Sequence, residues 1–276
     1  MTQTMIDDRT LKARHRAMWA LGDYPAVATE VIAALGPALV EAVAVTAGER
    51  LLDVAAGSGN VALPAARLGA RVTASDLTPE LLASGRAQSE AEGLEIAWET
   101  GDAEALPYAD HTFDVTTSCV GVMFAPHHQP AADELVRVTR RGGRIGLISW
   151  TPAGFIGQMF ATMKPYAPPP PPGASPAPWW GDESHVRALL GDRVVDVRAT
   201  TRVLPVTHFP TAEAFRDYFK INYGPTIAVY RALADQPDRR AALDQDLAEL
   251  GRRFGTATDG GMIMDWEYLL VTAVVV

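Results

Sequence analysis

The stretch that most constrains the fold of this chain is Leu51–Asn60, which reads LLDVAAGSGN. An apolar run ends at Asp53, and a Gly-x-Gly turn formed by Gly57 and Gly59 follows four residues later. Residues 60–68 then have the pattern of a helix. A buried strand that passes through a glycine turn into a helix is where α/β proteins bind nucleotide-like ligands, because glycine lets the backbone approach the ligand closely.

The carboxylate of Asp53 narrows the class of ligand. A negative charge directly before the turn would repel a pyrophosphate. It would attract a positively charged group, such as the ammonium of an amino acid. A nucleoside that carries an amino acid meets both requirements, so the turn favours S-adenosylmethionine over a dinucleotide.

The composition of the chain argues against several other classes of protein and of binding site. The 276 residues, 48% of them hydrophobic, have room for one large domain or for a domain with an inserted cap. The net charge of −9 disfavours a nucleic-acid partner. The single cysteine, Cys119, excludes an intrachain disulfide and a zinc site with several thiolates, and we expect no metal. Residues 1–16 are too polar for a signal peptide, and no apolar run reaches the ~20 residues of a bilayer span, which predicts a cytoplasmic protein without a membrane partner.

Strands and helices are predicted to alternate through the centre of the chain. Strands are expected at 50–54, 71–75, 95–99, 112–118 and, after a Gly142–Gly143 turn, 144–150, with helices at 60–68, 79–92 and 130–139. Such alternation predicts an α/β fold with a doubly wound, mostly parallel sheet. Helices at 10–21, 27–35 and 38–45 should precede the first strand, with Gly36–Pro37 ending the second of them.

The composition changes after Trp150. We expect a helix at 155–163, a stiff proline-rich segment at 168–178 that is neither helix nor central strand, a helix at 182–190 and a strand at 193–205. Helices at 212–221, 226–234 and 238–253 lead to a terminal strand at 266–276. These elements predict an N-terminal helical lid (1–45), a cofactor-binding core (46–151), a cap or substrate region (152–261) that holds one core strand, and a C-terminal core strand (262–276). The helical cap is thus inserted before the last strand of a seven-stranded sheet.

Further acidic residues follow the second and third strands. Asp76 comes 17 residues after the glycine turn, where a doubly wound sheet places the carboxylate that accepts from ribose hydroxyls. It could instead cap the helix that begins at Pro79. Asp102 is placed to accept from the adenine amino group while Ala103 donates its backbone N–H to the ring, and Leu77 would pack on the adenine face.

Together these motifs resemble those of class I S-adenosylmethionine-dependent methyltransferases, in the type 11 branch that includes quinone-biosynthesis C-methyltransferase-like proteins. The resemblance rests on DVAAGSG at 53–59, Asp76, GDAEALP at 101–107, and FDV at 113–115 followed by RGGR at 141–144. It implies a Rossmann-like methyltransferase fold, S-adenosylmethionine as cofactor and S-adenosylhomocysteine as product. The residues assigned to the cofactor are Tyr24, Asp53, Ala55, Gly57, Ser58, Gly59, Asp76, Leu77, Asp102, Ala103, Glu104 and Cys119.

The resemblance also implies individual contacts. Ala55 and Gly57 would contact the methionine moiety, and Cys119 would lie beside the sulfonium. In such proteins an N-terminal aromatic residue often closes over the cofactor, which makes Tyr24, and also Trp19, candidates. Both aromatic residues could equally pack in a core.

A general base is harder to identify. His127 and His128 follow the fourth strand, on the loop where methyltransferases often place groups that face the acceptor, and either could take a proton near neutral pH. They are the candidate catalytic residues, although they could also be a polar loop that leads into the next helix. His185 and His208, in the cap, are weaker candidates.

The cap is rich in large apolar side chains, among them Phe215, Tyr218 and Phe219 at helical spacing. Such spacing is typical of a core, but an aromatic cap also favours a small hydrophobic or aromatic acceptor. The acceptor atom (oxygen, nitrogen, sulfur or carbon) stays open. No Asn-Pro-Pro-Tyr-like element follows the fourth strand, which argues against amino-group methylation of bases or glutamine.

Two other functions remain open at this point. A nicotinamide-dependent reductase would need a third glycine in the Gly-x-Gly-x-x-Gly pattern, and none occurs at 60–63. A non-catalytic, methyltransferase-like binding protein would keep the cofactor motifs without turnover. We expect a small-molecule substrate, and a homodimer is an assembly that the sequence leaves open.

Overall fold

The computed structural model describes residues 8–170 and 173–276, so the expectations for residues 1–7 and 171–172 lie outside the described part. The described residues form two compact units. The sheet unit takes residues Ala33–Pro152, Ser175–Arg202 and Tyr268–Val276. The helical unit takes the described residues of Met1–Ile32, Ala153–Ala174 and Val203–Glu267.

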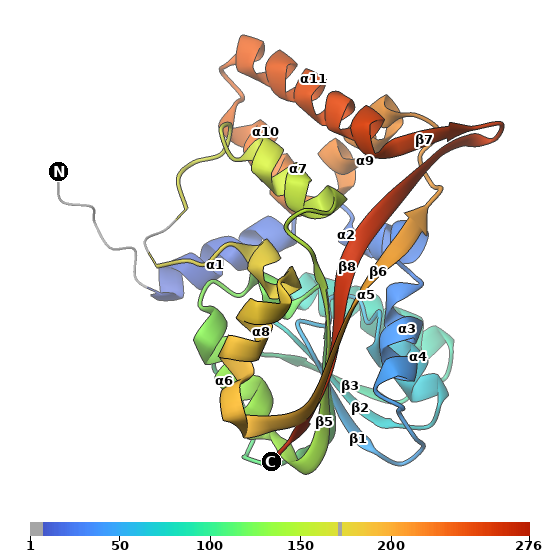
Figure 1. Cartoon of the computed structure of the whole chain (residues 1–276), viewed down its shortest axis with the longest axis vertical. Helices are drawn as coiled ribbons and strands as arrows, with labels where there is room; N and C mark the ends of the chain where they lie inside the picture. Colours follow the sequence, from blue (N-terminus) through green and yellow to red (C-terminus); the bar gives the residue numbers. More distant parts are fainter. Residues whose placement is uncertain (1–7, 171–172) are drawn as a thin grey trace. The chain divides into compact units, whose positions relative to one another are not determined.

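A seven-stranded mixed sheet is built in the order β3-β2-β1-β4-β5-β8-β6 (Figure 1). β1 to β5 pair in parallel, and β8 pairs antiparallel with β5. This confirms the predicted fold class. A further short strand, β7, pairs with β8 beside this path and was not predicted. The strands are β1 (Arg50–Val54), β2 (Arg71–Asp76), β3 (Ile96–Thr100), β4 (Phe113–Cys119), β5 (Thr139–Trp150), β6 (Val194–Val206), β7 (Gly255–Thr258) and β8 (Gly261–Val275).

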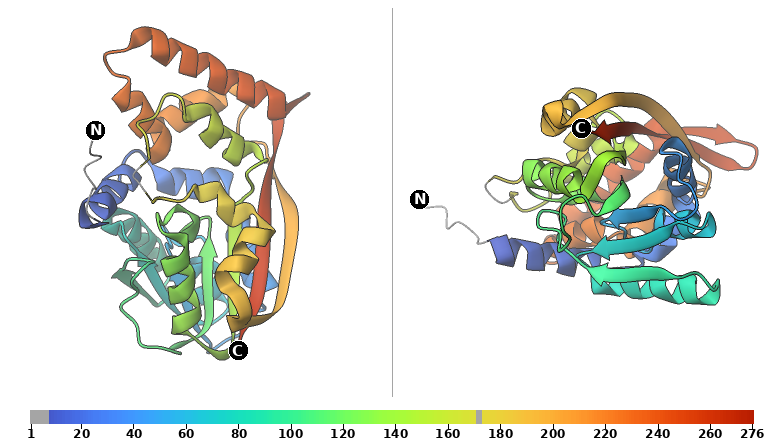
Figure 2. Two further views of the ribbon diagram at one scale, coloured as in Figure 1. Left: turned by 60° about the vertical axis from the view of Figure 1, so that its left-hand side comes forward. Right: turned by 90° about the horizontal axis from the view of Figure 1, so that it is seen from below.

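Helices of the sheet unit lie on both sides of its strands (Figure 1). α3 (Leu35–Ala42), α4 (Ala62–Arg67) and α5 (Pro79–Ala91) are on one side, and α6 (His128–Val138) and α8 (Glu183–Leu190) are on the other. Figure 2 shows these elements from two more directions. Because both faces are covered, β1 is buried from its second residue onward, including the carboxylate of Asp53. Short 3-10 turns, η2 (Val122–Phe124), η3 (Ala177–Gly181) and η4 (Gly191–Arg193), complete the unit.

Two local predictions in the sheet unit were wrong. The Gly36–Pro37 pair does not end a helix, because α3 begins at Leu35 and holds the proline in its first turn, where no backbone donor is needed. The Gly142–Gly143 pair is not a turn between elements. β5 already begins at Thr139 and accommodates the extra residues where its register with β4 shifts.

The proline-rich segment ends differently from the prediction. We expected no helix up to residue 178, yet η3 holds Pro178 in its first turn, which proline tolerates. The predicted helix at 182–190 is present as α8, and the Asp182 side chain caps it by accepting from the His185 backbone N–H.

The helical unit is built around stacked aromatic rings. The Phe155 and Trp266 rings stack with centroids 5.1 Å apart, and Phe209, Phe215 and Phe219 pack around them. All five side chains are at most 2% exposed. These aromatic residues therefore form a core. The helices of this unit are α1 (Asp8–Trp19), α2 (Tyr24–Ala26), the π-helix η1 (Val27–Val31), α7 (Phe155–Met163), α9 (Ala212–Asn222), α10 (Gly224–Ala232) and α11 (Pro237–Phe254).

Within the described residues, no single helix has both the length and the apolar character needed to cross a membrane. The short helical stretches Tyr24–Val31 and Leu35–Ala42 reach that length and composition only when taken together across the break between them.

Candidate cofactor site

The turn after β1 has the backbone geometry that its glycines predict. Gly57 and Gly59 have φ values of 56° and 96°, in the left-handed region that favours glycine. A Cβ on Gly59 would also lie 2.6 Å from the ring of Trp98. Ala55 has a φ of 52° although it carries a Cβ, and Ser58 is only 6% exposed. The turn is therefore tight, and the ring of Trp98 packs closely against it.

Asp53 is buried beneath this turn. Its carboxylate is 1% exposed, accepts from the Ala62 backbone N–H at 3.1 Å, and lies 3.4 Å from the Thr117 hydroxyl. Burial raises the pKa of the Asp53 carboxyl to about 7, and the negative charge of Asp76 acts in the same direction. Asp53 thus holds the start of α4 against β1 at a cost in electrostatic free energy.

Asp76 ends β2 and faces the same turn. One of its carboxylate oxygens accepts from the Gly57 N–H at 2.8 Å and the other from the Thr78 N–H at 2.8 Å. The residue is 8% exposed, and burial raises the pKa of its carboxyl. The Thr78 side chain and the Leu77 backbone also contribute hydrogen bonds that lower the pKa of this carboxyl. The hydroxyls of a ribose would share the carboxylate with these donors.

The two carboxylates beside the glycine turn suit the class of ligand expected from the sequence. Asp53 and Asp76 place two buried carboxylates around one glycine turn, and both have raised pKa values. A ligand that brings positive charge and hydroxyl donors would stabilise the ionised forms. A pyrophosphate would bring more negative charge to the same place.

The loop after β3 carries the residues predicted to contact adenine. The Asp102 side chain accepts from the Glu104 N–H at 3.0 Å, and the Asp102 backbone carbonyl accepts from the Ala105 N–H at 3.0 Å in a short β-bridge. Leu77, Asp102 and Ala103 are each half-buried, so they line the surface without being part of the core. Their contacts with adenine stay predictions.

The loop after β4 is tied to the turn by a residue that sequence reasoning missed. The Ser118 hydroxyl donates to the Val54 carbonyl at 2.7 Å and accepts from the Val122 N–H at 2.8 Å. Cys119 follows it, 9% exposed, and burial raises the pKa of its thiol well above the ordinary value. Cys119 is thus a neutral thiol. A hydroxyl residue at the end of a buried strand was the available signal for Ser118.

The two candidate catalytic histidines lie in different surroundings. His127 faces Glu104, its Nδ1 2.9 Å from one carboxylate oxygen. His128 is 3% exposed, and its Nδ1 lies 2.9 Å from Nε2 of His185. Its ring also packs against Trp180, with centroids 5.5 Å apart. Burial lowers the pKa of His128 to about 4, and the neighbouring His185 adds to the shift.

Tyr24 and Trp19 belong to the helical unit. The two rings meet edge to face with centroids 5.4 Å apart, and both contact the ring of Tyr223. Trp19 and Tyr24 are half-buried, whereas Tyr223 is 5% exposed. Their closure over a cofactor stays a prediction. His208, also in this unit, lies 3.6 Å from a carboxylate oxygen of Glu30.

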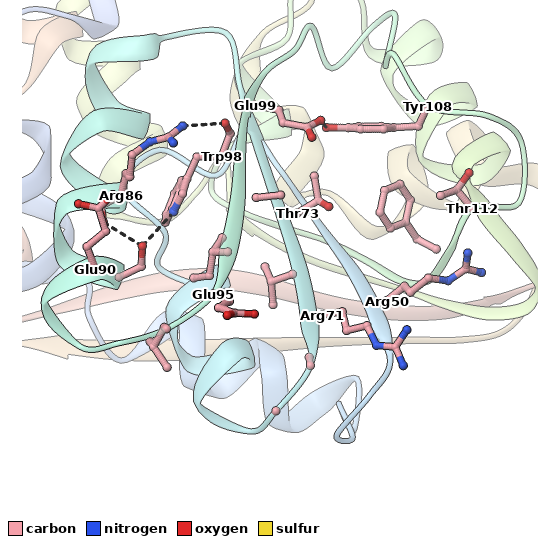
Figure 3. Close-up of a pocket in the computed structure, with 18 residues that line it drawn as sticks. Arg50, Arg71, Thr73, Arg86, Glu90, Glu95, Trp98, Glu99, Tyr108 and Thr112 are labelled. Atoms are coloured by element: carbon pink, nitrogen blue, oxygen red, sulfur yellow. Dashed lines mark hydrogen bonds between the residues drawn. The ribbon is translucent and has the colours of Figure 1, made fainter.

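A hollow of about 900 Å³ lies along the edge strand β3 of the sheet unit (Figure 3). Glu99 and Tyr108 point toward each other at one end, and Arg50 and Arg71 lie at the other. Its lining contains none of the residues predicted for the cofactor or for catalysis. This hollow is therefore separate from the candidate site.

Comparison with known proteins agrees with this geometry. A model of the methyltransferase domain (type 11) matches residues 52–147. An uncharacterized protein of Mycobacterium tuberculosis is 52% identical over 267 residues, which cover 97% of this chain and 96% of that protein. The ubiquinone/menaquinone biosynthesis C-methyltransferase of Roseobacter denitrificans is 40% identical over 119 residues, 41% of this chain and 47% of that enzyme. The crystal structure of the YcgJ protein of Bacillus subtilis covers 86% of this chain and 96% of its own, with a TM-score of 0.59 and 18% identity.

The matched residues begin within β1 and end within β5, so they include the glycine turn and the loops after β2, β3 and β4. Residues 52–147 therefore carry a methyltransferase domain of the type 11 family.

Proposed function

We propose that this chain transfers a methyl group from S-adenosylmethionine to a small hydrophobic or aromatic acceptor by in-line displacement. The observation that carries the proposal is the pair of buried carboxylates, Asp53 and Asp76, on either side of one glycine turn. Their raised pKa values favour a cationic nucleoside over a diphosphate.

Each cofactor contact is assigned to a residue whose surroundings suit it. Asp76 would accept from the ribose hydroxyls beside its contacts with the Gly57 and Thr78 backbone N–H groups. Asp102 and the Ala103 N–H would bind the adenine edge, with Leu77 against its face. The backbone of the glycine turn would hold the methionine moiety. The neutral thiol of Cys119 would lie beside the sulfonium.

The bound sulfonium supplies a methyl group that is activated for attack by a nucleophile. The protein's contribution is to align the acceptor with the carbon–sulfur bond and to exclude water, since alignment alone accounts for a large part of such accelerations. Metal ions are not needed for this role.

The acceptor class is proposed from the composition of the helical unit. Its buried rings form a core, but Trp19, Tyr24 and Phe160 are only half-buried around Tyr223. Half-buried aromatic side chains are suited to an apolar or aromatic molecule. The net charge of −9 supports a small molecule over a nucleic acid.

Calorimetry with S-adenosylhomocysteine and with NADH tests the cofactor half of the proposal. We expect S-adenosylhomocysteine to bind and NADH not to bind, and the reverse result would favour the reductase. A panel of hydroxy, amino and thiol aromatic acceptors then tests turnover by the release of S-adenosylhomocysteine. Tight cofactor binding without any turnover would favour the non-catalytic binding protein.

A further inference from the structure

We propose that the hollow along β3 is a second binding site, which takes a small molecule with one carboxylate or phosphate group and an apolar body. Arg50 and Arg71 bind the anionic group at one end, and the body lies along the open face of β2 and β3 toward Tyr108. This site is separate from the cofactor site, so the inference goes beyond the proposed function and does not depend on it.

The hollow exists because, among the described residues, no helix packs on one face of β2 and β3. α4 and α5 pack against β2 and β3 from one side, whereas α6, on the other side, packs against β4 and β5. The connection from β3 to β4, residues 101–112, forms no helix of its own. Doubly wound sheets usually carry helices on both faces, so this part of the sheet is open. Its volume of about 900 Å³ is within the range of small-molecule sites.

Strand alternation decides which side chains face the hollow. Arg71 and Thr73 lie on one face of β2, opposite the buried Val72. Their register partners are Arg50 in β1 and Ala97 in β3. Register partners of parallel strands share a face, so these four side chains line the hollow together. Thr73 and Ala97 are small, and they leave the centre of the face free for the body of a ligand.

The basic end of the hollow carries more positive charge than its neighbours balance. Arg50 and Arg71 begin neighbouring strands that lie about 4.8 Å apart, so their like charges repel. Asp114 lies 3.7 Å from Nε of Arg50, but it is closer to Nε of Arg140, at 2.6 Å. Within the described residues the Arg71 guanidinium makes no ion pair, and Figure 3 shows it pointing away from Glu95. An anion bound here would therefore relieve the repulsion between the two arginines.

Guanidinium groups suit the anionic group of the proposed ligand. Each presents N–H donors in a plane that matches two oxygens of a carboxylate or a phosphate. The hydroxyl of Thr73 lies two residues along β2 from Arg71, on the same face, and adds a neutral donor. These groups make this end of the hollow the part that binds an anion.

The opposite end of the hollow limits the ligand to one anionic group. Glu99 lies there and accepts from the Tyr108 hydroxyl at 2.9 Å. Its carboxylate repels a second negative charge, whereas the Tyr108 ring, edge to face with Phe113 at 5.1 Å between centroids, provides an apolar wall. Glu99 pairs with Ser75, four residues along β2 from Arg71, so the two ends are about 13 Å apart. The hollow therefore takes a molecule such as an aryl phosphate or an aryl carboxylate.

The two sites lie at opposite ends of the same strands. Arg50 begins β1 and Arg71 begins β2, whereas Asp53 and Asp76 lie at the carboxyl ends of these strands, beside the glycine turn. The lining of the hollow contains none of the residues assigned to the cofactor. A ligand in the hollow therefore leaves the glycine turn accessible, and the two ligands bind without competition.

The test uses the full chain and calorimetry at low ionic strength, with phenyl phosphate, benzoate, inorganic phosphate and uncharged benzyl alcohol as ligands. The variants are Arg71→Gln, which removes one positive charge from the hollow, and Ala97→Phe, which fills its centre. Arg198→Gln is the matched control, because Arg198 is an exposed arginine of β6, at the opposite edge of the same sheet. Thermal unfolding checks that each variant is folded.

We expect phenyl phosphate and benzoate to bind, and benzyl alcohol to bind about tenfold more weakly or less well than that. The tighter of the two anions identifies the preferred group. Arg71→Gln should raise the dissociation constants of both anions by about tenfold or more, and Arg198→Gln by less than about twofold. Ala97→Phe should weaken phenyl phosphate by about tenfold or more and inorganic phosphate by less than about threefold, because only the aryl group needs the centre of the hollow. Saturation with phenyl phosphate should leave the affinity for S-adenosylhomocysteine unchanged.

Four outcomes would overturn the inference. Failure of the wild-type chain to bind either aryl anion would remove the site. Equal effects of Arg71→Gln and Arg198→Gln would show that the anions respond only to the overall charge of the protein. Unchanged affinity for phenyl phosphate in Ala97→Phe would place the aryl group outside the hollow. Displacement of phenyl phosphate by S-adenosylhomocysteine would place the anion in the cofactor site.

Discussion

The carboxylate of Asp76 accepts a hydrogen bond from the backbone N–H of Gly57 at a donor–acceptor distance of 2.8 Å, across 19 residues of sequence. The contact joins the end of β2 to the glycine turn after β1. One side chain therefore fixes the shape of the turn, and it is also the proposed acceptor for the ribose hydroxyls.

Substitution of Asp76 should separate these two roles. Asp76→Ala removes the acceptor for Gly57 together with the proposed ribose contact, so the dissociation constant of S-adenosylhomocysteine should rise by more than tenfold. Asp76→Asn keeps one oxygen acceptor and should give a smaller increase. Calorimetry measures both, with Glu99→Gln as a control on the exposed part of the sheet. Unchanged affinity in Asp76→Ala would remove Asp76 from the site.

Stability should depend on pH through Asp53. Its folded-state pKa of about 7 lies above the ordinary value near 3.9, so the folded state binds more protons than the unfolded state between these values. The contribution of Asp53 to stability is therefore fully present below pH 4 and falls as pH rises toward 7, by up to roughly 1.4 kcal/mol per pH unit. Asp53→Asn should raise the Tm of the ligand-free protein at pH 8 and leave it nearly unchanged at pH 4. A variant less stable than the wild type at pH 8 would contradict this.

Binding of S-adenosylmethionine should depend on the same carboxyl. A cationic ligand favours ionised Asp53, so its affinity should increase as pH rises from about 5.5 to 8. S-adenosylhomocysteine keeps the ammonium group but lacks the sulfonium charge, so it should show only the part of the dependence that comes from the ammonium. The comparison of the two ligands in wild type and Asp53→Asn, by calorimetry at several pH values, isolates the charge effect. Equal pH dependence for both ligands would contradict a role of the sulfonium charge.

His128 should have the opposite effect on stability. Its pKa is lowered to about 4, so the unfolded state binds more protons between pH 4 and about 6.5, and stability is lost as pH falls through that range. In the wild type the pH dependence of stability that comes from His128 opposes the one that comes from Asp53. Each contribution must therefore be measured as the difference between a variant and the wild type. The free energy of unfolding of His128→Phe minus that of the wild type should be more positive at pH 4.5 than at pH 7.5. Denaturant unfolding at the two pH values measures this difference, and a pH-independent one would contradict it.

Because Trp98 packs against the glycine turn, an added methyl group should destabilise the protein more at Gly59 than at Gly48. Gly59→Ala combines a φ of 96° with a Cβ 2.6 Å from the Trp98 ring, and should destabilise the protein by about 2–4 kcal/mol. Gly48→Ala is the matched control. Its φ is 82°, but nothing lies within 4 Å of the added Cβ, so it should cost only about 1–2 kcal/mol. Equal losses in urea unfolding would show that Trp98 moves aside freely.

The alternation of strands and helices, the glycine turn and the acidic residues after successive strands could be predicted from the sequence alone. These features are local, since each depends on residue periodicity, backbone preference or spacing within about 25 residues. The predictions failed where a neighbouring strand or helix decided the outcome. The register shift between β4 and β5 absorbs the Gly142–Gly143 pair, and β7 forms only because β8 lies beside it.

Tertiary structure alone decided which side chains meet. Glu104 and His127 come from different loops, and His128 meets His185 across 57 residues of sequence. No periodicity in the chain records such a pairing, because it depends on how the elements pack. For the same reason the sequence could name two adjacent histidines as candidate bases, while only the fold shows that one faces a buried carboxylate and the other a second histidine.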